Sequence, residues 1–180
     1  LLHQQLCKLA VDLDCYMTYN KIMKKIAVFD LDGTVIDSAH RTPNKADGTL
    51  DLDGYFQLRT RENIFKDTLL PLAEIMKEMY ESGDYHIVIC TARDMTEDDY
   101  DFLDDHGLKY HEIFNRNNIR KKYHWGLPDA QYKTKQLKKY KTSQYIFFDD
   151  AQPIIDTFRD YPNVEMIDAK TENKRMRYGT

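Results

Sequence analysis

The 180-residue chain lacks the apolar run of roughly 20 residues that a bilayer-spanning helix needs, so we expect no membrane association. It also lacks an opening basic stretch followed by an apolar core, so no secretory signal is expected. Its three cysteines (Cys7, Cys15 and Cys90) have no metal-ligand spacing, and Cys90 lies in an apolar run that is typical of a packed thiol. These absences together favour a reduced, cytoplasmic setting.

Positive charge is not in excess. Lys and Arg number 26 against 30 Asp and Glu, a formal net charge of −4, which argues against a chain-wide nucleic-acid surface but not against a local one. No repeat, linker or low-complexity block is present, and the length fits one domain. We predict that residues 23–169 form this domain. Residues 1–22 are expected to be an extension, either helical or artefactual, and 170–180 a polar, frayed tail.

Short apolar runs alternate with segments of helical periodicity from residue 26 onward, which is typical of a parallel α/β fold. One helix is expected over 71–80, with Pro71 in its first turn and Gly83 past its end. Further helices are expected after Thr96, after Asp129 and around Ile154. The expected strands are residues 26–29, 85–90, 110–114, 145–148 and 164–167. The fold class is therefore a Rossmann-like three-layer sandwich with a parallel five-stranded sheet.

Polar residues follow three of these expected strands directly. Right-handed crossovers predict that strands two and three lie on one side of strand one, and four and five on the other. Ligands in open α/β sheets bind beyond the carboxyl ends of the strands, where this order reverses. Asp30, Thr91 and Asp149 each stand at such an end, so we expect them to meet in one crevice.

Two carboxylates two residues apart, Asp30 and Asp32, suit phosphoryl transfer. An Asp carboxylate can attack phosphorus and form an aspartyl-phosphate. A second Asp can protonate the leaving oxygen and later deprotonate the attacking water. Asp149 and Asp150 bring two more acids to the same place. Because four converging carboxylates would repel one another, a cation is expected, and oxygen ligands favour Mg²⁺.

The order of these features resembles that of the haloacid dehalogenase (HAD) superfamily over residues 26–168. The motifs that carry the resemblance are Asp30-x-Asp32-Gly33-Thr34-Val35, the strand ending in Thr91, a downstream lysine, and Asp149 with Asp150. The resemblance implies that Asp30 is the nucleophile, Asp32 the acid/base and Thr91 a phosphoryl ligand. Asp30, the carbonyl of Asp32, Asp149 and Asp150 would hold Mg²⁺. The aspartate at position 32 favours a phosphatase over a dehalogenase.

The motif lysine has two candidates. Lys133 opens the helix after a tyrosine and fits the usual placement better than Lys135 does. The lysines at 138, 139 and 141 are interpreted as a solvated helix face.

The motif layout also resembles the phosphatase domain of polynucleotide kinase-phosphatase and small phage-encoded HAD proteins. In the first of these, arginines stand where Arg41 and Arg93 stand here, which implies that both bind substrate together with Gly33 and Thr34. The favoured substrate is a nucleotide or polynucleotide 3'-phosphate end. A phosphatase of small metabolites or mononucleotides is the alternative, and a catalytically silent phosphate-binding module is the alternative of another class. The oligomeric state stays open.

Two further segments could carry a function of their own. Asp51-Leu52-Asp53-Gly54 copies the letters of the first motif, but no apolar strand precedes it, so we interpret it as a structural loop or hairpin. Tyr123 and Trp125 could stack a base, and the basic residues beside them could hold a phosphate, although a charged loop is the simpler interpretation. These basic residues are Arg116, Arg120, Lys121 and Lys122. The interval 37–66 is too short for a large helical cap, and the interval 94–132 is mostly accounted for by a helix, a strand and a basic loop. We therefore expect a minimal cap or none, and an open cleft.

Overall fold

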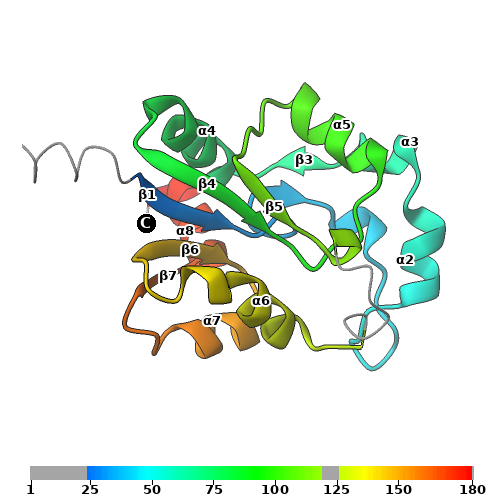
Figure 1. Cartoon of the computed structure of the whole chain (residues 1–180). Helices are drawn as coiled ribbons and strands as arrows, with labels where there is room; N and C mark the ends of the chain where they lie inside the picture. Colours follow the sequence, from blue (N-terminus) through cyan, green and yellow to red (C-terminus); the bar gives the residue numbers. More distant parts are fainter. Residues whose placement is uncertain (1–23, 119–125, 180) are drawn as a thin grey trace, which may run out of the picture.

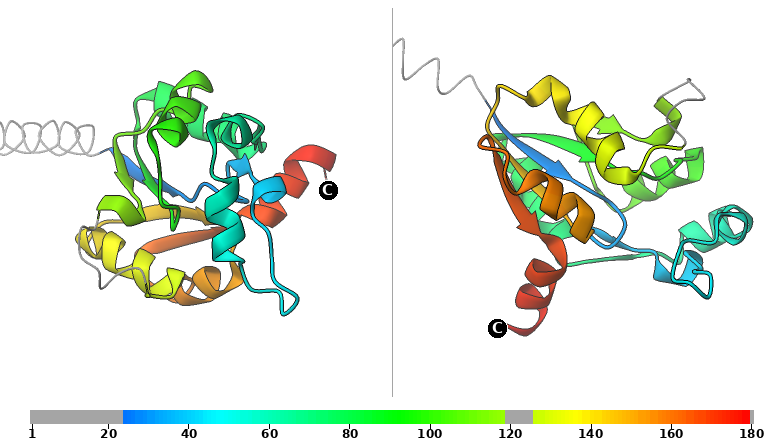
Figure 2. Two further views of the ribbon diagram at one scale, coloured as in Figure 1. Left: turned by 90° about the vertical axis from the view of Figure 1, so that its right-hand side faces the viewer. Right: turned by 90° about the horizontal axis from the view of Figure 1, so that it is seen from below.

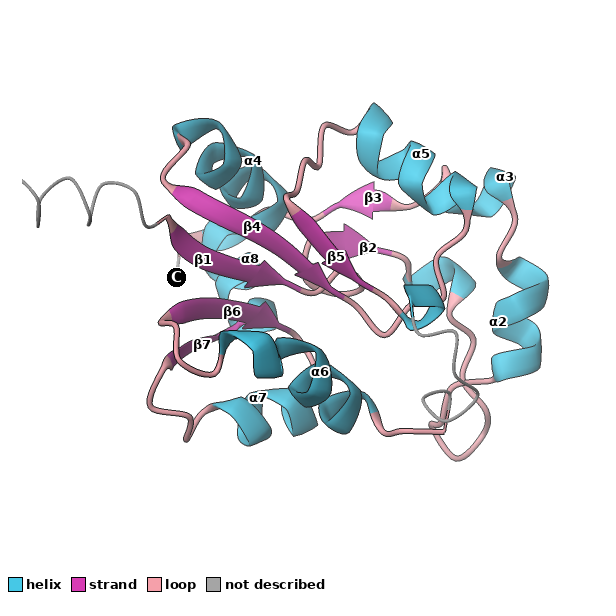
Figure 3. Ribbon diagram, viewed as in Figure 1, coloured by secondary structure: helices cyan, strands magenta, loops and turns pink. Residues whose placement is uncertain are grey.

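The computed structural model describes residues 24–118 and 126–179. At its centre lies a sheet of five parallel strands in the order β5-β4-β1-β6-β7. The strands are β1 (Lys25–Phe29), β4 (Tyr85–Cys90), β5 (Glu112–Phe114), β6 (Tyr145–Asp149) and β7 (Val164–Asp168). Helices cover both faces of the sheet (Figures 1 and 3), so the predicted three-layer α/β architecture and strand order are confirmed.

Alternate residues of the central strands enter two separate cores. Ala27 and Phe29 face a cluster with α4 (Leu72–Ser82), α5 (Glu97–Asp105) and α8 (Ala169–Tyr178). Val28 faces the other cluster, with α6 (Asp129–Leu137) and α7 (Gln152–Phe158). Full burial of such a side chain stabilises the fold by about 1.5–3 kcal/mol, which is why strands covered on both faces have continuous apolar sequences.

Most expected elements form, with shifted ends. β5 begins at Glu112 rather than at residue 110, and α6 passes into a 3₁₀ turn, η3 (Lys138–Tyr140), after Leu137. Thr96 caps α5 through a capping box with Asp99, as its position predicts. The helix α4 ends at Gly83, whose φ of 73° places it in the left-handed region that glycine accommodates.

The expectation of a polar, frayed tail over residues 170–180 is corrected by the structure. Residues 169–178 form helix α8, whose first turn is capped by Asp168 through bonds from the Lys170 and Thr171 amides. Asn173 is buried, accepts a hydrogen bond from the Leu72 amide (2.9 Å) and donates one to the Thr34 carbonyl (2.9 Å). Because a polar side chain makes these buried contacts, hydrophobic periodicity does not reveal the helix.

A small insertion follows the first motif. The short strands β2 (Ile36–Asp37) and β3 (Thr68–Leu69) pair antiparallel and enclose η1 (Ala39–Arg41), α2 (Leu52–Leu58) and α3 (Arg61–Ile64). An end-on view shows α2 standing across the carboxyl ends of the sheet strands (Figure 2). A minimal cap is therefore present.

Two expectations about this region are corrected. The segment at 51–54 begins helix α2 instead of forming only a loop, although an antiparallel bridge between Asn44 and Leu50 does precede it. Leu52, Tyr55 and Phe56 of α2 line the cavity, so the cleft has a wall on this side and is not fully open. Among the described residues, no helix is long and apolar enough to cross a membrane.

Candidate active site

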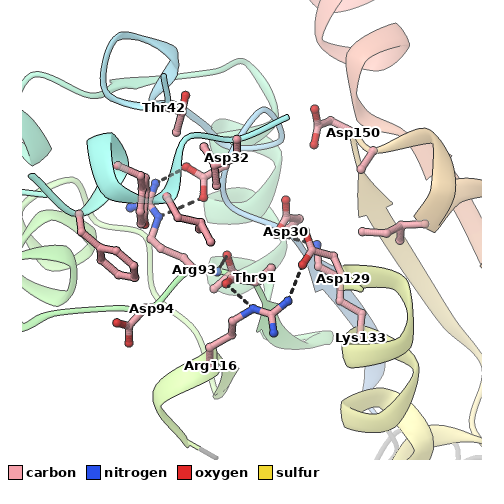
Figure 4. A pocket seen from close by; sticks show the side chains of 17 residues that line it. Asp30, Asp32, Thr42, Thr91, Arg93, Asp94, Arg116, Asp129, Lys133 and Asp150 are labelled. Atoms are coloured by element: carbon pink, nitrogen blue, oxygen red, sulfur yellow. Dashed lines mark hydrogen bonds and ion pairs between the residues drawn. The ribbon is translucent and has the colours of Figure 1, made fainter. Parts of the chain in front are cut away.

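A cavity of about 340 Å³ opens at the carboxyl ends of β1, β4 and β6. One side of the cavity brings together polar residues from four separate segments of the chain (Figure 4). They are Asp30, Asp32, Thr91, Arg93, Lys133 and Asp150. The predicted crevice therefore exists, and six of the residues predicted for it line the cavity.

Asp30 lies at the floor of the cavity and is 6% exposed. Its amide donates to the Phe148 carbonyl (3.0 Å), which ties the end of β1 to β6. Lys133 Nζ lies 2.8 Å from Asp30 Oδ1 and 2.7 Å from Asp149 Oδ2. Burial raises the pKa of Asp30 to about 8 although Lys133 opposes the shift, so the ionised form needs positive charge nearby.

The lysine ambiguity has a geometric answer. Lys133 is buried and its ammonium bridges two carboxylates, whereas Lys135 points to the exposed side of α6. Burial alone would lower the pKa of Lys133, but Asp30 and Asp149 together raise it, so this ammonium is a fixed charge.

Three carboxylates form a candidate metal centre. Ligand oxygens of Asp30, Asp149 and Asp150 lie within 4.8 Å of one another. Asp149 is fully buried and its Oδ1 accepts the Ala151 amide (3.0 Å), so its orientation is fixed. The Asp150 side chain is 20% exposed and pairs with Lys170 (3.2 Å). A set of hard oxygen donors, partly open to solvent, fits Mg²⁺, which keeps several waters.

Asp32 points away from Asp30 and toward Arg93 (Figure 4). Arg93 donates to both of its oxygens, from Nε at 3.1 Å and from Nη2 at 2.5 Å, and Ser38 donates a further hydrogen bond. Although burial acts in the opposite direction, Arg93 and Ser38 lower the pKa of Asp32 to about 2. The carboxylate is thus held ionised in this arrangement, while its side chain stays 38% exposed to the cavity.

Thr91 stands where β4 ends, and its amide donates to the Phe114 carbonyl (2.9 Å). Its hydroxyl accepts the Arg93 amide (3.1 Å), so strand end and arginine are fixed together. Thr91 lines the cavity, which is the position that a phosphoryl ligand requires.

Three predicted substrate contacts lie elsewhere. Arg41 is 1% exposed and outside the cavity lining, and both arms of its guanidinium that face Asp67 donate to that carboxylate (2.8 and 2.7 Å). Thr34 is fully buried in the fold. Gly33 packs against Asp150, where a Cβ would come within 2.5 Å of the carboxylate. Gly33 therefore makes room for a metal-site residue and does not line this cavity.

Arg116 is interpreted from the sequence as part of a charged loop, whereas the structure places it in the cavity lining, and the cavity residues of the insertion are not predicted from the sequence. Arg116 follows β5, donates to the Ala92 carbonyl (3.0 Å) and pairs with Asp129 (2.5 Å), which also lines the cavity. The strand-end rule that identifies Thr91 also applies to β5, so a signal for Arg116 existed. The stacking candidates Tyr123 and Trp125 lie outside the described residues.

The insertion supplies an apolar wall opposite the acids. Leu50, Leu52, Tyr55 and Phe56 line the cavity from this side. Among the described residues, five large hydrophobic side chains are exposed, and three of them belong to this wall. Helix α2 has no buried residue, so its apolar side has no partner in the core. Such a concentration of exposed apolar surface is typical of a ligand site.

Two comparisons with known proteins match this chain to phage 5'-deoxynucleotidases. The family described as Bacteriophage T5 5'-deoxynucleotidase matches residues 17–180. A 5'-deoxynucleotidase of Escherichia phage T5 is 29% identical over 180 residues, covering 87% of this chain and 72% of that protein.

Solved structures share the fold at low identity. A chain of the Pnkp1/Rnl/Hen1 RNA repair complex matches with a TM-score of 0.57 and 19% identity over 81% of this chain, which spans only 42% of that chain. A HAD-superfamily hydrolase from Geobacter sulfurreducens matches with a TM-score of 0.53 and 13% identity, over 77% of this chain and 86% of that one. A putative beta-phosphoglucomutase from Thermotoga maritima matches with a TM-score of 0.55 and 12% identity, over 85% and 98% of the two chains.

Proposed function

The chain belongs to the bacteriophage T5 5'-deoxynucleotidase family, and we propose from this premise that it hydrolyses nucleoside 5'-monophosphates through an aspartyl-phosphate on Asp30, with Mg²⁺ bound. The chain is an HAD-type phosphatase, as the resemblance of its motifs implies. The alternative of a catalytically silent phosphate-binding module is therefore excluded. The observation that carries the proposal is the position of Asp30 at the cavity floor, between Lys133 and the acids of the metal centre.

In the first half-reaction, a carboxylate oxygen of Asp30 attacks phosphorus. The bond from phosphorus to Asp30 forms while the bond to the 5'-oxygen breaks, and Asp32 gives its proton to the departing alkoxide. Lys133 and the Thr91 hydroxyl neutralise and orient the phosphoryl oxygens.

In the second half-reaction, Asp32 takes a proton from water, and the resulting hydroxide attacks the aspartyl-phosphate. Phosphate leaves and Asp30 returns to its starting state. Asp32 must therefore be protonated at one moment and ionised at the next. Its side chain is exposed to the cavity, so the leaving oxygen and the water can reach it while Arg93 holds it in place.

The acidic donor set suits a bound Mg²⁺. Asp30, Asp149 and Asp150 would hold the ion together with the Asp32 carbonyl, and Mg²⁺ would supply positive charge to the transferring phosphoryl group. That charge would also favour the ionised form of Asp30, which burial alone disfavours.

The apolar wall supports a nucleoside over a simple sugar phosphate. With the phosphate at Asp30, the volume of about 340 Å³ extends toward Leu52 and Phe56, which can pack against a base. The resemblance to polynucleotide kinase-phosphatase keeps a 3'-phosphate end of a polynucleotide as the second candidate, because Arg116, although paired with Asp129, adds a guanidinium to the cavity lining. The wall favours the mononucleotide.

A substrate panel tests this proposal. The chain with Mg²⁺ is assayed on deoxynucleoside 5'-monophosphates, 2-deoxyribose 5-phosphate and a 3'-phosphorylated oligonucleotide. We expect the highest kcat/KM for the nucleotides, and we expect Phe56→Ala to reduce their advantage over the base-free sugar phosphate by roughly tenfold. Tyr178→Ala, an exposed aromatic outside this cavity, is the matched control. Equal rates on nucleotide and sugar phosphate would refute base recognition, and preference for the oligonucleotide would favour the second candidate.

A further inference from the structure

Four buried charges lie directly behind the cavity wall. Arg41, Asp67, Arg93 and Asp99 are each at most 5% exposed, and only Arg93 reaches the cavity lining. They come from η1, the turn before β3, the loop after β4 and the first turn of α5. We call these four residues the charge cluster. It ties both ends of the insertion to the edge of the sheet.

The cluster alternates in sign, which is what buried charges require. Asp67 accepts hydrogen bonds from Arg41 Nε and Nη2 and lies 3.7 Å from Arg93. Asp99 accepts from Arg93 Nη1 at 2.8 Å and lies 3.6 Å from Arg41. Within the charge cluster, each guanidinium thus has two acidic neighbours and each carboxylate has two guanidinium neighbours. A buried charge left without its partner is strongly unfavourable, so the four side chains hold one another in place.

Arg93 connects this cluster to the catalytic residues. Its Nη1 is bonded to Asp99, and its Nε and Nη2 are bonded to the two oxygens of Asp32. A guanidinium is planar and rigid, so an acid on one edge fixes the direction of the donors on the other. The position of Asp32 therefore depends on Asp99, which itself lies outside the cavity lining.

We propose that Asp99, supported by Arg41 and Asp67, is a positioning residue that orients Arg93 and through it the acid/base Asp32. This inference rests on the proposed function, because it takes Asp32 as the acid/base. It also gives Arg41 a role that needs no contact with substrate. The insertion that carries the apolar wall and the acid that protonates the leaving group are then held by the same buried charges.

The proposal makes the nature of the leaving group decisive. A nucleoside alkoxide must be protonated as it departs, whereas p-nitrophenolate leaves without help. A misplaced Asp32 therefore harms the first half-reaction with a nucleotide more than with p-nitrophenyl phosphate. General loss of structure would harm both alike. Because kcat/KM reports the steps up to departure of the alcohol, it separates these cases.

The test substitutes Asp99→Asn. The amide oxygen can still accept the Thr96 amide that caps α5, while the amide nitrogen cannot pair with Arg93. We expect kcat/KM to fall roughly ten- to a hundredfold for a deoxynucleoside monophosphate and by no more than about threefold for p-nitrophenyl phosphate. Asp98→Asn is the matched control, since Asp98 lies in the same turn but pairs with the exposed Arg61. Equal losses on both substrates would overturn the proposal.

A double-mutant cycle distinguishes this proposal from the proposed function. If Asp99 acts through Asp32, adding Asp99→Asn to Asp32→Asn should cost little further activity, whereas independent effects would multiply. If Asp32→Asn alone has no leaving-group dependence, the proposed acid/base role fails. If it has one and the two effects multiply, only the positioning role fails. Arg41→Lys, which keeps the charge but loses the paired donors to Asp67, should repeat the Asp99→Asn pattern more weakly if Asp99→Asn does not fold.

Discussion

The same four residues, Asp-Leu-Asp-Gly, occur at 30–33 and at 51–54 and have opposite structures. The first copy follows the buried strand β1, and Leu31 is fully buried while Asp30 faces the cavity floor. The second copy begins α2, where Asp51 is the N-cap residue and Leu52 is 56% exposed. What precedes each copy makes the difference, because an apolar strand delivers its last residue to the edge of a sheet and a loop does not.

The glycines of the two copies differ in the same way. Gly33 has a φ of +73°, a left-handed turn that brings the backbone up to Asp150. Gly54 lies within helix α2. Glycine is thus required in the first copy by its left-handed backbone, whereas at Gly54 only the nearby side-chain atoms of Asp51 and Pro43 oppose a Cβ.

The largest expected effect separates the two leading aspartates. Asp30→Asn should lower kcat by more than about 10³-fold, because an amide does not attack phosphorus. Asp51→Asn, which preserves an N-cap residue, should leave kcat within a factor of about two. Steady-state kinetics and thermal unfolding of both variants check this. Retention of a few per cent of activity by Asp30→Asn would remove it as the nucleophile.

Metal binding should depend on the acids around the first copy and not on those of the second. Removal of divalent ions with EDTA should abolish activity, Mg²⁺ should restore it, and Ca²⁺ should inhibit, because its longer bonds and higher coordination number disturb in-line attack. Mg²⁺ should also raise the melting temperature of the wild type and of Asp53→Asn, but not of Asp150→Asn. An undiminished Mg²⁺ shift in Asp150→Asn would contradict its place in the metal centre.

The leucines should differ in stability. Leu31→Ala removes a fully buried side chain and should lower the free energy of unfolding by about 2–5 kcal/mol. Leu52→Ala should change it by less than about 0.5 kcal/mol, since the side chain is exposed. Denaturant unfolding of both variants measures these values. A comparable loss in Leu52→Ala would mean that α2 packs more firmly than its exposure indicates.

The smallest effect concerns the glycines. Gly33→Ala should cost about 1–2 kcal/mol from the left-handed backbone, and its Cβ should displace Asp150 and weaken Mg²⁺ binding. Gly54→Ala should change stability by less than about 1 kcal/mol, because helix propensity offsets the shift of nearby Asp51 and Pro43 side-chain atoms. Calorimetric unfolding with and without Mg²⁺ measures both. Equal losses would show that the left-handed turn is not the cause.

Much of the site could be predicted because it depends on strand ends. Asp30, Thr91 and Asp149 were placed by apolar runs and by the handedness of crossovers, both of which are local or general rules. The position of Arg41 could not be predicted in this way, because the sequence does not distinguish a buried arginine from an exposed one. Its place depends on Asp67, 26 residues away, and no periodicity connects the two.

The apolar runs were enough to predict the sheet, its strand order and the acids at the carboxyl ends of its strands, because apolar runs of that length must be buried. The folded chain was needed to show that α2 walls the cavity, that α8 packs through Asn173, and that Arg93 lies between Asp32 and Asp99. These features rest on polar side chains paired across distant segments, or on apolar side chains left exposed. A sequence pattern is interpreted by assuming that apolar residues are buried and polar ones exposed. Here burial depends instead on partners that only the folded chain brings together.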